Sequence, residues 1–164
     1  GAAAAAGCDA CPEAPRVAVH YSWDCLLHVR DARAEGRHVA VDSVLIPMGT
    51  AEDLRALALE VSPQVFAADR QVMEQEFGLE GSRRNSCHFA VAFPVSVPLE
   101  LLRPPILILD GLDSQHVIGQ MIRTAYLFGV NSVVASRAAW QALDGRACRV
   151  AMGWPYHMDF HLAE

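Results

Sequence analysis

Lysine is absent from this chain, and all 13 of its positively charged residues are arginines. A GC-rich coding sequence explains this bias more simply than selection for bidentate phosphate contacts, so the bias alone indicates no partner. No run of 18 apolar residues occurs, and the sequence therefore predicts no membrane-spanning helix. Residues 1–15 lack the pattern of a signal peptide, and their Ala-rich, then Gly- and Pro-bearing composition predicts a disordered tail.

A disulfide framework and an excess of positive charge are also missing. The five cysteines are scattered and odd in number, which favours an intracellular location, either cytoplasmic or organellar. Residues 1–100 hold 8 Arg against 14 acidic residues, and residues 101–164 hold 5 of each. A non-specific nucleic-acid binder needs a basic surface, so DNA is not an expected partner. A local basic patch would still suffice for one shaped RNA.

The patterns that are present divide the chain into two α/β units. In the first, residues 37–95, strand patterns at 38–47, 63–69 and 87–95 alternate with helix patterns at 49–63 and 70–81. Thr50 is the expected N-cap of the first of these helices. Upstream, residues 17–39 mix strand and helix signals. The Pro-bearing segment 94–105 breaks both periodicities and is the candidate linker.

The second unit begins with a strand at residues 105–109 that is too apolar to be exposed on either face. Asp113 or Ser114 can cap the helix that follows. Its buried stripe is predicted from the spacing i, i+3, i+4, i+7, and consists of Ile118, Met121, Ile122 and Ala125. Gly129 is the expected stop, and residues 130–136 form the next strand, which implies a right-handed parallel crossover.

Another side of the same helix carries His116, Gly119, Gln120 and Arg123, again at i, i+3, i+4, i+7. Glycine inside a helix costs roughly 1 kcal/mol relative to alanine, so a close approach of a ligand or of another backbone should offset it. Two interpretations remain open from the pattern alone. Either the line is a binding surface, or it is a surface arginine beside a glycine that allows helix packing.

Residues 113–136, DSQHVIGQMIRTAYLFGVNSVVAS, resemble the first motif of the SpoU (TrmH) branch of the SPOUT RNA methyltransferases. That motif runs Asn-x-Gly, three residues, Arg-Thr/Ser/Asn-Ala and then a Phe-Gly-Val turn into a strand. The matching residues are Gly119, Arg123, Thr124, Ala125, Phe128, Gly129 and Val130. Downstream, residues 145–153 are similar to the R-x-x-R-V-S-M-G segment of one subgroup. Its matches are Arg146, Arg149, Val150, Met152 and Gly153.

This resemblance implies an α/β fold class with two parts. Residues 16–100 would form a small α/β substrate-recognition domain, and residues 101–164 the N-terminal half of an α/β-knot (SPOUT) parallel-sheet domain. The implied activity is S-adenosylmethionine-dependent methyl transfer to a ribose 2′-hydroxyl of tRNA or rRNA, by a homodimer. The cofactor-binding segments of the family are expected beyond Glu164, so the chain alone is expected to be inactive and not to bind S-adenosylmethionine.

The resemblance also assigns site residues. Arg123 would be catalytic, and because the pKa of arginine exceeds 12, stabilisation of developing charge is a safer role for it than that of a base. His116, Gly119 and Gln120 would contact substrate. The residues implied to contact RNA phosphates are Arg146, Arg149, Arg83 and Arg84.

Two departures from the family pattern support a second hypothesis, a non-catalytic RNA-binding homologue. Val117 stands in the place of the motif asparagine, or His116 if the turn slides by one residue, and Ala151 stands where the subgroup has serine. A third hypothesis, an unrelated nucleotide-binding module, is disfavoured because no glycine-rich phosphate loop follows either candidate strand.

No metal site is predicted, although two segments have metal-like spacing. Cys8 and Cys11 form an isolated pair, whereas zinc needs four ligands. His157 and His161 stand at i, i+4 without the glutamate and third ligand of a zinc protease. The three tryptophans are expected as core or interface residues rather than as platforms for RNA bases.

Overall fold

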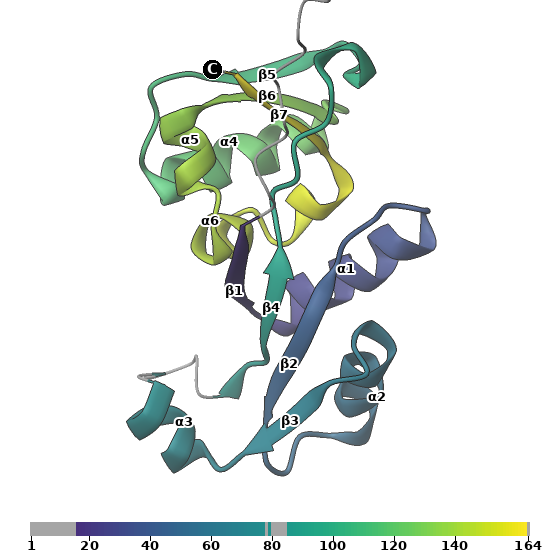
Figure 1. The fold of residues 1–164 in the computed structure, drawn as a ribbon, viewed down its shortest axis with the longest axis vertical. Coiled ribbons are helices and arrows are strands. Elements are labelled where there is room, and N and C mark those ends of the chain that lie inside the picture. Colours follow the sequence, from purple (N-terminus) through teal and green to yellow (C-terminus); the bar gives the residue numbers. More distant parts are fainter. Residues whose placement is uncertain (1–15, 78, 80–84, 164) are drawn as a thin grey trace, which may run out of the picture.

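The computed structural model describes residues 16–77, 79 and 85–163, and it shows two lobes that each contain one β-sheet (Figure 1). The predicted tail, residues 1–15, lies outside the described residues. The first lobe consists of β1 Val17–Tyr21, α1 Trp23–Ala34, β2 Val41–Pro47, α2 Glu52–Val61, β3 Val65–Ala68, α3 Arg70–Phe77 and β4 His88–Ala92. The second consists of β5 Ile106–Leu109, α4 Gln115–Leu127, β6 Ser132–Ser136, α5 Arg137–Ala142, α6 Gly145–Val150 and β7 Asp159–Ala163. Two 3-10 helices, η2 Leu99–Leu101 and η3 Trp154–His157, complete the described elements.

The first sheet has the strand order β1-β4-β2-β3, with β2 and β3 parallel and the other pairs antiparallel. Val44 on β2 and Phe89 on β4 are opposite each other and fully or almost fully buried, in one core with Leu26 of α1 and Leu57 of α2. The alternating patterns therefore placed the strands correctly, because one face of this sheet packs against α1 and α2.

The predicted cap of α2 is wrong. Ala51 occupies the N-cap position, and the Thr50 hydroxyl donates instead to the carbonyl oxygen of Pro47 at 2.6 Å. The tight turn that follows β2 uses the hydroxyl first, so the helix starts without a side-chain cap. Glu52 and Asp53 in the first turn still interact favourably with the positive end of the helix dipole.

The second sheet is parallel, in the order β5-β6-β7. In the view of Figure 1, α4, α5 and α6 lie between this sheet and the first lobe. The prediction that β5 is hidden on both faces is wrong, since β5 is an edge strand whose Ile106 and Ile108 are 38% and 67% exposed. Only its opposite face packs against the helices, where Leu109 is completely buried. Apolar composition shows that a strand favours burial, but not whether the described chain covers it.

The segment predicted as a linker, residues 94–105, is joined to the second sheet. The Val97 N–H donates to the carbonyl oxygen of Phe160 at 2.8 Å, and the Leu162 N–H donates to the Ser96 hydroxyl at 3.1 Å. These bonds satisfy part of the outer edge of β7. Proline removes donors from a segment, but the residues between the prolines keep theirs, so the segment can still pair locally.

The two lobes pack directly against each other, and their buried residues form one continuous core. A Cβ added at Gly145 of α6 would come within 2.6 Å of the carbonyl oxygen of Val19 on β1, so only a bare backbone fits there. Within the described residues, no helix is both long and apolar enough to cross a bilayer.

Candidate functional site

Helix α4 is held at both ends by the signals predicted for it. The Ser114 hydroxyl accepts a hydrogen bond from the N–H of Val117, which caps the first turn. At the other end Gly129 adopts a left-handed φ of 80°, and the N–H of Val130 donates to the carbonyl oxygen of Ala125 at 3.0 Å. The helix that carries the candidate site is therefore well defined by its own sequence.

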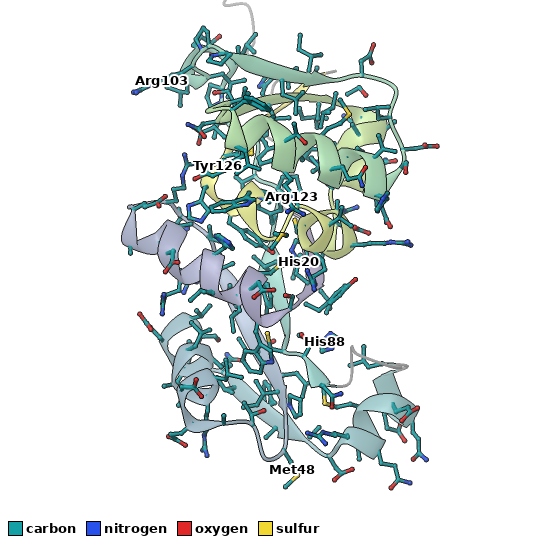
Figure 2. The ribbon with its side chains drawn as sticks, turned by 180° about the vertical axis from the view of Figure 1, so that it is seen from behind. His20, Met48, His88, Arg103, Arg123 and Tyr126 are labelled. Atoms are coloured by element: carbon teal, nitrogen blue, oxygen red, sulfur yellow. The ribbon has the colours of Figure 1, made fainter. Side chains whose placement is uncertain are left out.

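Arg123 is exposed on α4, near the boundary between the two lobes (Figure 2). Among the described residues it forms no hydrogen bond and no ion pair with another side chain. Gln120 and His116, about one and two turns before it, are also exposed. Three of the four residues in the predicted line thus share a solvent-facing surface and are available to a ligand.

Gly119, the fourth residue of the line, does not lie on that surface. It is buried against α6, and an added Cβ would lie 2.6 Å from the carbonyl oxygen of Ala147 and 2.7 Å from Cβ of Val150. The close approach that offsets the cost of this glycine is therefore that of another helix backbone. This agrees with the interpretation in which the glycine allows helix packing. The helical spacing was right, but it could not show that α6 covers this part of the helix.

The contact between α4 and α6 extends to their first turns through one carboxylate. Asp144 caps α6 by accepting from the N–H groups of Arg146 and Ala147 at 2.9 and 3.1 Å, and it also accepts from the Gln115 side chain. Arg146 and Arg149 are exposed on α6. Arg123 and these two arginines are therefore exposed on two helices that pack against each other. Arg83 and Arg84 lie outside the described residues.

A polar network that the sequence did not reveal joins the lobes beside α4. A carboxylate only accepts, so Nδ1 of His157 donates to Glu35 of the first lobe over 2.8 Å. Nε2 of His157 lies 3.0 Å from Nδ1 of His28, within hydrogen-bonding distance. Burial and, second, the neighbouring His157 lower the pKa of His28. The Trp154 ring packs 4.3 Å from His28 and stacks on Tyr126 of α4 at 4.6 Å.

His157 and His161 do not form the pair that their spacing suggested. His157 ends η3 and is buried, whereas His161 lies on β7 and its Nδ1 is 2.9 Å from the Val97 carbonyl oxygen. The chain changes from a 3-10 helix to a strand between them, so the i, i+4 spacing does not bring the two side chains to one helix face. Across the described part of the chain, no group of three or more His, Cys, Asp or Glu is arranged to hold a metal ion. Cys8 and Cys11 lie outside that part.

His20 of β1 is buried where β1 meets the second lobe, with Nδ1 2.6 Å from the Tyr156 hydroxyl. Burial and, to a lesser degree, the charge of Arg16 lower the pKa of His20 to about 4. Its imidazole is therefore neutral at physiological pH. Nε2 has no hydrogen-bond partner among the described residues.

The buried cysteines are not nucleophiles. Burial raises the pKa of the Cys25 thiol to about 12, and the pKa values of Cys87 and Cys148 are raised for the same reason. A thiolate is the reactive form, so these three side chains behave as small apolar groups.

The comparisons with known proteins concern the fold. No protein-family model matches the sequence, and no curated protein matches it. The solved structures that resemble it include the SpoU methyltransferase AviRb from Streptomyces viridochromogenes in complex with AdoMet, with a TM-score of 0.71 and 16% identity over 90% of this chain. An rRNA methyltransferase from Sinorhizobium meliloti has a TM-score of 0.66 and 16% identity over 91% of this chain. An RNA 2′-O ribose methyltransferase has a TM-score of 0.63 and 16% identity over 92%.

The chain has the SpoU methyltransferase fold. The predicted fold class is confirmed, since the chain combines a mixed first sheet with a parallel second sheet and matches AviRb over 90% of its length. The chain spans about half of each similar protein, 55% of AviRb and 56% of the ribose methyltransferase. Within the SpoU fold, the polar network between the lobes is what sequence reasoning missed, because its partners are more than 120 residues apart.

Proposed function

We propose that the full-length protein is an RNA methyltransferase of the SpoU type, which transfers a methyl group from S-adenosylmethionine to a ribose 2′-hydroxyl of tRNA or rRNA. The observation that carries this proposal is Arg123, which is exposed and has no partner among the described residues, on a helix that matches the family motif and lies in a SpoU-like fold. The similar proteins include AviRb bound to AdoMet and a 2′-O ribose methyltransferase. A homodimer is proposed as the working form.

A ribose hydroxyl is a poor nucleophile until the negative charge that develops on its oxygen is stabilised. Arg123 is suited to that task, because its guanidinium is always charged and no carboxylate among the described residues neutralises it. His116 and Gln120 can donate to the same nucleotide from the preceding turns. Arg146 and Arg149 on α6 would contact phosphates, which positions the RNA without reading its bases. Gly119 contributes by letting α6 approach.

We expect that the described residues do not form a complete site for S-adenosylmethionine by themselves. Open α/β sheets bind ligands at the carboxyl ends of their strands, which here place Asp110 and Ser136 together. The Ser136 hydroxyl already accepts from the Gly111 N–H at 3.0 Å. One exposed carboxylate and one occupied hydroxyl cannot enclose a nucleoside. S-adenosylmethionine, when bound, supplies an electrophilic methyl group.

The decisive experiment measures transfer of a labelled methyl group to total tRNA and rRNA by the full-length protein. Arg123→Ala is expected to lower the rate about 100-fold or more, as loss of a charge-stabilising donor does elsewhere. The matched control is Arg55→Ala, which removes an exposed arginine on α2 and should leave the rate unchanged. Full activity of Arg123→Ala would contradict the assigned role.

A non-catalytic RNA-binding protein is the second candidate, because Val117 stands where the family motif has an asparagine. Its side chain is 41% exposed beside His116, so an amide there would reach a ligand, whereas valine offers no hydrogen bond. RNA binding without methyl transfer, and without binding of S-adenosylmethionine, would favour this candidate. Methyl transfer gained only in Val117→Asn would identify the missing amide as the reason.

A further inference from the structure

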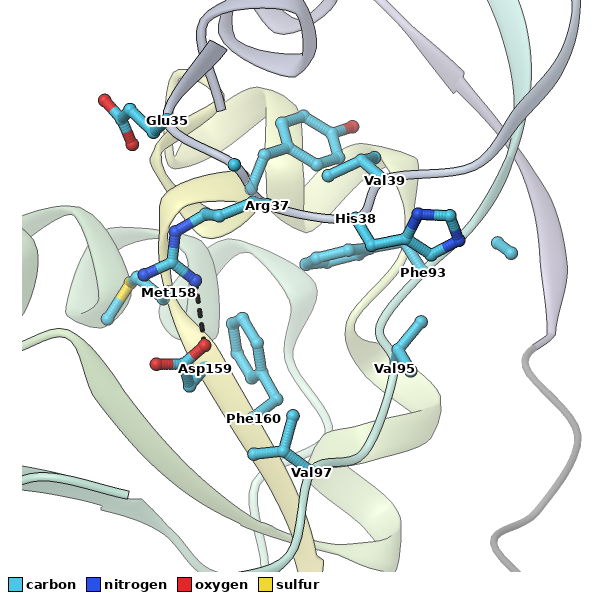
Figure 3. A pocket seen from close by; sticks show the side chains of 13 residues that line it. Glu35, Arg37, His38, Val39, Phe93, Val95, Val97, Met158, Asp159 and Phe160 are labelled. Carbon is cyan, nitrogen blue, oxygen red and sulfur yellow. Dashed lines mark hydrogen bonds and ion pairs between the residues drawn. The ribbon is translucent and has the colours of Figure 1, made fainter. Parts of the chain in front are cut away.

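A cleft of about 460 Å³ lies between the two lobes, and none of the residues predicted from sequence for catalysis or RNA binding lines it (Figure 3). The first lobe contributes residues 35–39, after α1, and the second contributes the start of β7. The segment that connects the lobes contributes residues 93–97. Its volume falls in the range of pockets that bind small organic groups.

One wall of this interlobe cleft is apolar. Its accessible surface includes Val95, which is 44% exposed, and the half-buried Val97. Phe93 and Phe160 also line the cleft but are only 6% and 1% exposed, and their rings meet edge to face with centroids 5.5 Å apart. Such an apolar surface suits the face of a flat, weakly polar ring.

The other wall carries an ion pair that still has hydrogen-bonding groups to offer a ligand. Nη1 of Arg37 donates to Oδ1 of Asp159 at 2.8 Å, and the two side chains are 28% and 41% exposed. That bond leaves guanidinium N–H groups and the second carboxylate oxygen without a partner among the described residues. Because the two charges neutralise each other, the wall suits a neutral ligand with hydrogen-bond donors and acceptors side by side.

Both walls are positioned before any ligand arrives. The Arg37 N–H donates to the Ala32 carbonyl oxygen at 3.0 Å, and the Asp159 N–H donates to that of Asn131 at 2.9 Å. The Glu35–His157–His28 chain joins the lobes next to the cleft. A preformed site loses less conformational entropy on binding than a mobile one.

We propose that this cleft binds a single nucleobase, taken from an unpaired position of the RNA that the protein recognises. The statement that the base comes from RNA rests on the proposed function, whereas the statement that the cleft binds a base does not. The face of a base can lie on the apolar wall at Val95 and Val97, and its edge presents donors and acceptors to Arg37 and Asp159. The site extends RNA recognition to a surface that needs both lobes.

The test titrates the four nucleoside 5′-monophosphates, and ribose 5-phosphate as the probe without a base, against the full-length protein by calorimetry. Val95→Trp is designed to fill the cleft, and Val72→Trp on α3 is its control, since the two valines are 44% and 43% exposed. Asp159→Asn removes the carboxylate while keeping the size of the side chain. Both cleft variants should weaken binding of at least one nucleotide about tenfold, and the control should not. Far-UV circular dichroism confirms that each variant is folded.

Equal binding of ribose 5-phosphate and the nucleotides, or unchanged binding by Val95→Trp, would overturn the proposal. Competition by an unstructured RNA oligonucleotide that contains the preferred base supports the RNA source. Failure of that RNA to compete would overturn that source and assign the cleft to a free nucleotide. Methyl transfer is measured in parallel. If it is absent while nucleotides bind as expected, the proposed function fails and the base-binding cleft stands.

Discussion

Gly119→Ala is the substitution whose effect can be worked out most directly from the structure. The new Cβ would lie 2.6 Å from the Ala147 carbonyl oxygen and 2.7 Å from the Val150 Cβ, so either α4 or α6 has to move. Inserting a methyl group into a packed contact of this kind costs ~1–3 kcal/mol, with the upper half expected where one partner is backbone. Alanine regains ~1 kcal/mol of helix propensity. The net loss should be about 1–2 kcal/mol.

Thermal unfolding followed by circular dichroism measures this loss. For a chain of this size, about 1–2 kcal/mol corresponds to a fall in Tm of ~2–8 °C. The control is Gln120→Ala, which changes the neighbouring exposed residue and should leave Tm within about 1 °C. A Tm for Gly119→Ala equal to or above that of the unchanged protein would refute the packing argument. Loss of RNA binding with an unchanged Tm would mean that the glycine faces a ligand instead.

Two further predictions follow from buried titratable groups. The pKa of His20 is lowered from 6.5 to about 4 on folding, so only the unfolded chain binds a proton there between these values. The free energy of unfolding should therefore fall by about 3 kcal/mol as the pH drops from 6.5 to 4, and urea unfolding of His20→Gln should show a shallower slope; an identical slope would contradict the assignment. The thiols of Cys25, Cys87 and Cys148, buried and with raised pKa values, should stay unmodified by iodoacetamide at pH 8 in the folded protein and react in urea. Peptide mass mapping that finds them alkylated without denaturant would disprove their burial.

Helix α4 of the second lobe was predictable because its signals are local. Ser114 needs only the N–H of Val117 to cap α4, and Gly129 needs only its own left-handed φ to end it. Both conditions involve residues within one turn of the helix. The Thr50 prediction failed because a second local signal competed with the first. The Pro47 carbonyl oxygen accepts from the Thr50 hydroxyl, which therefore does not cap the helix.

The sequence by itself determined the order of elements from β2 to β4 and from β5 to β6, the likeness to SpoU methyltransferases and the choice of Arg123, because periodicity and motif spacing are properties of neighbouring residues. Only the tertiary structure decided that Gly119 packs against Val150 of α6, and that Arg37 of the first lobe meets Asp159 of the second. Those contacts depend on how the helices of the second lobe dock on the first. That geometry is set by the core that the two lobes share and by the bare backbone at Gly145. These are contacts between residues far apart in the sequence, so no local sequence pattern reveals them.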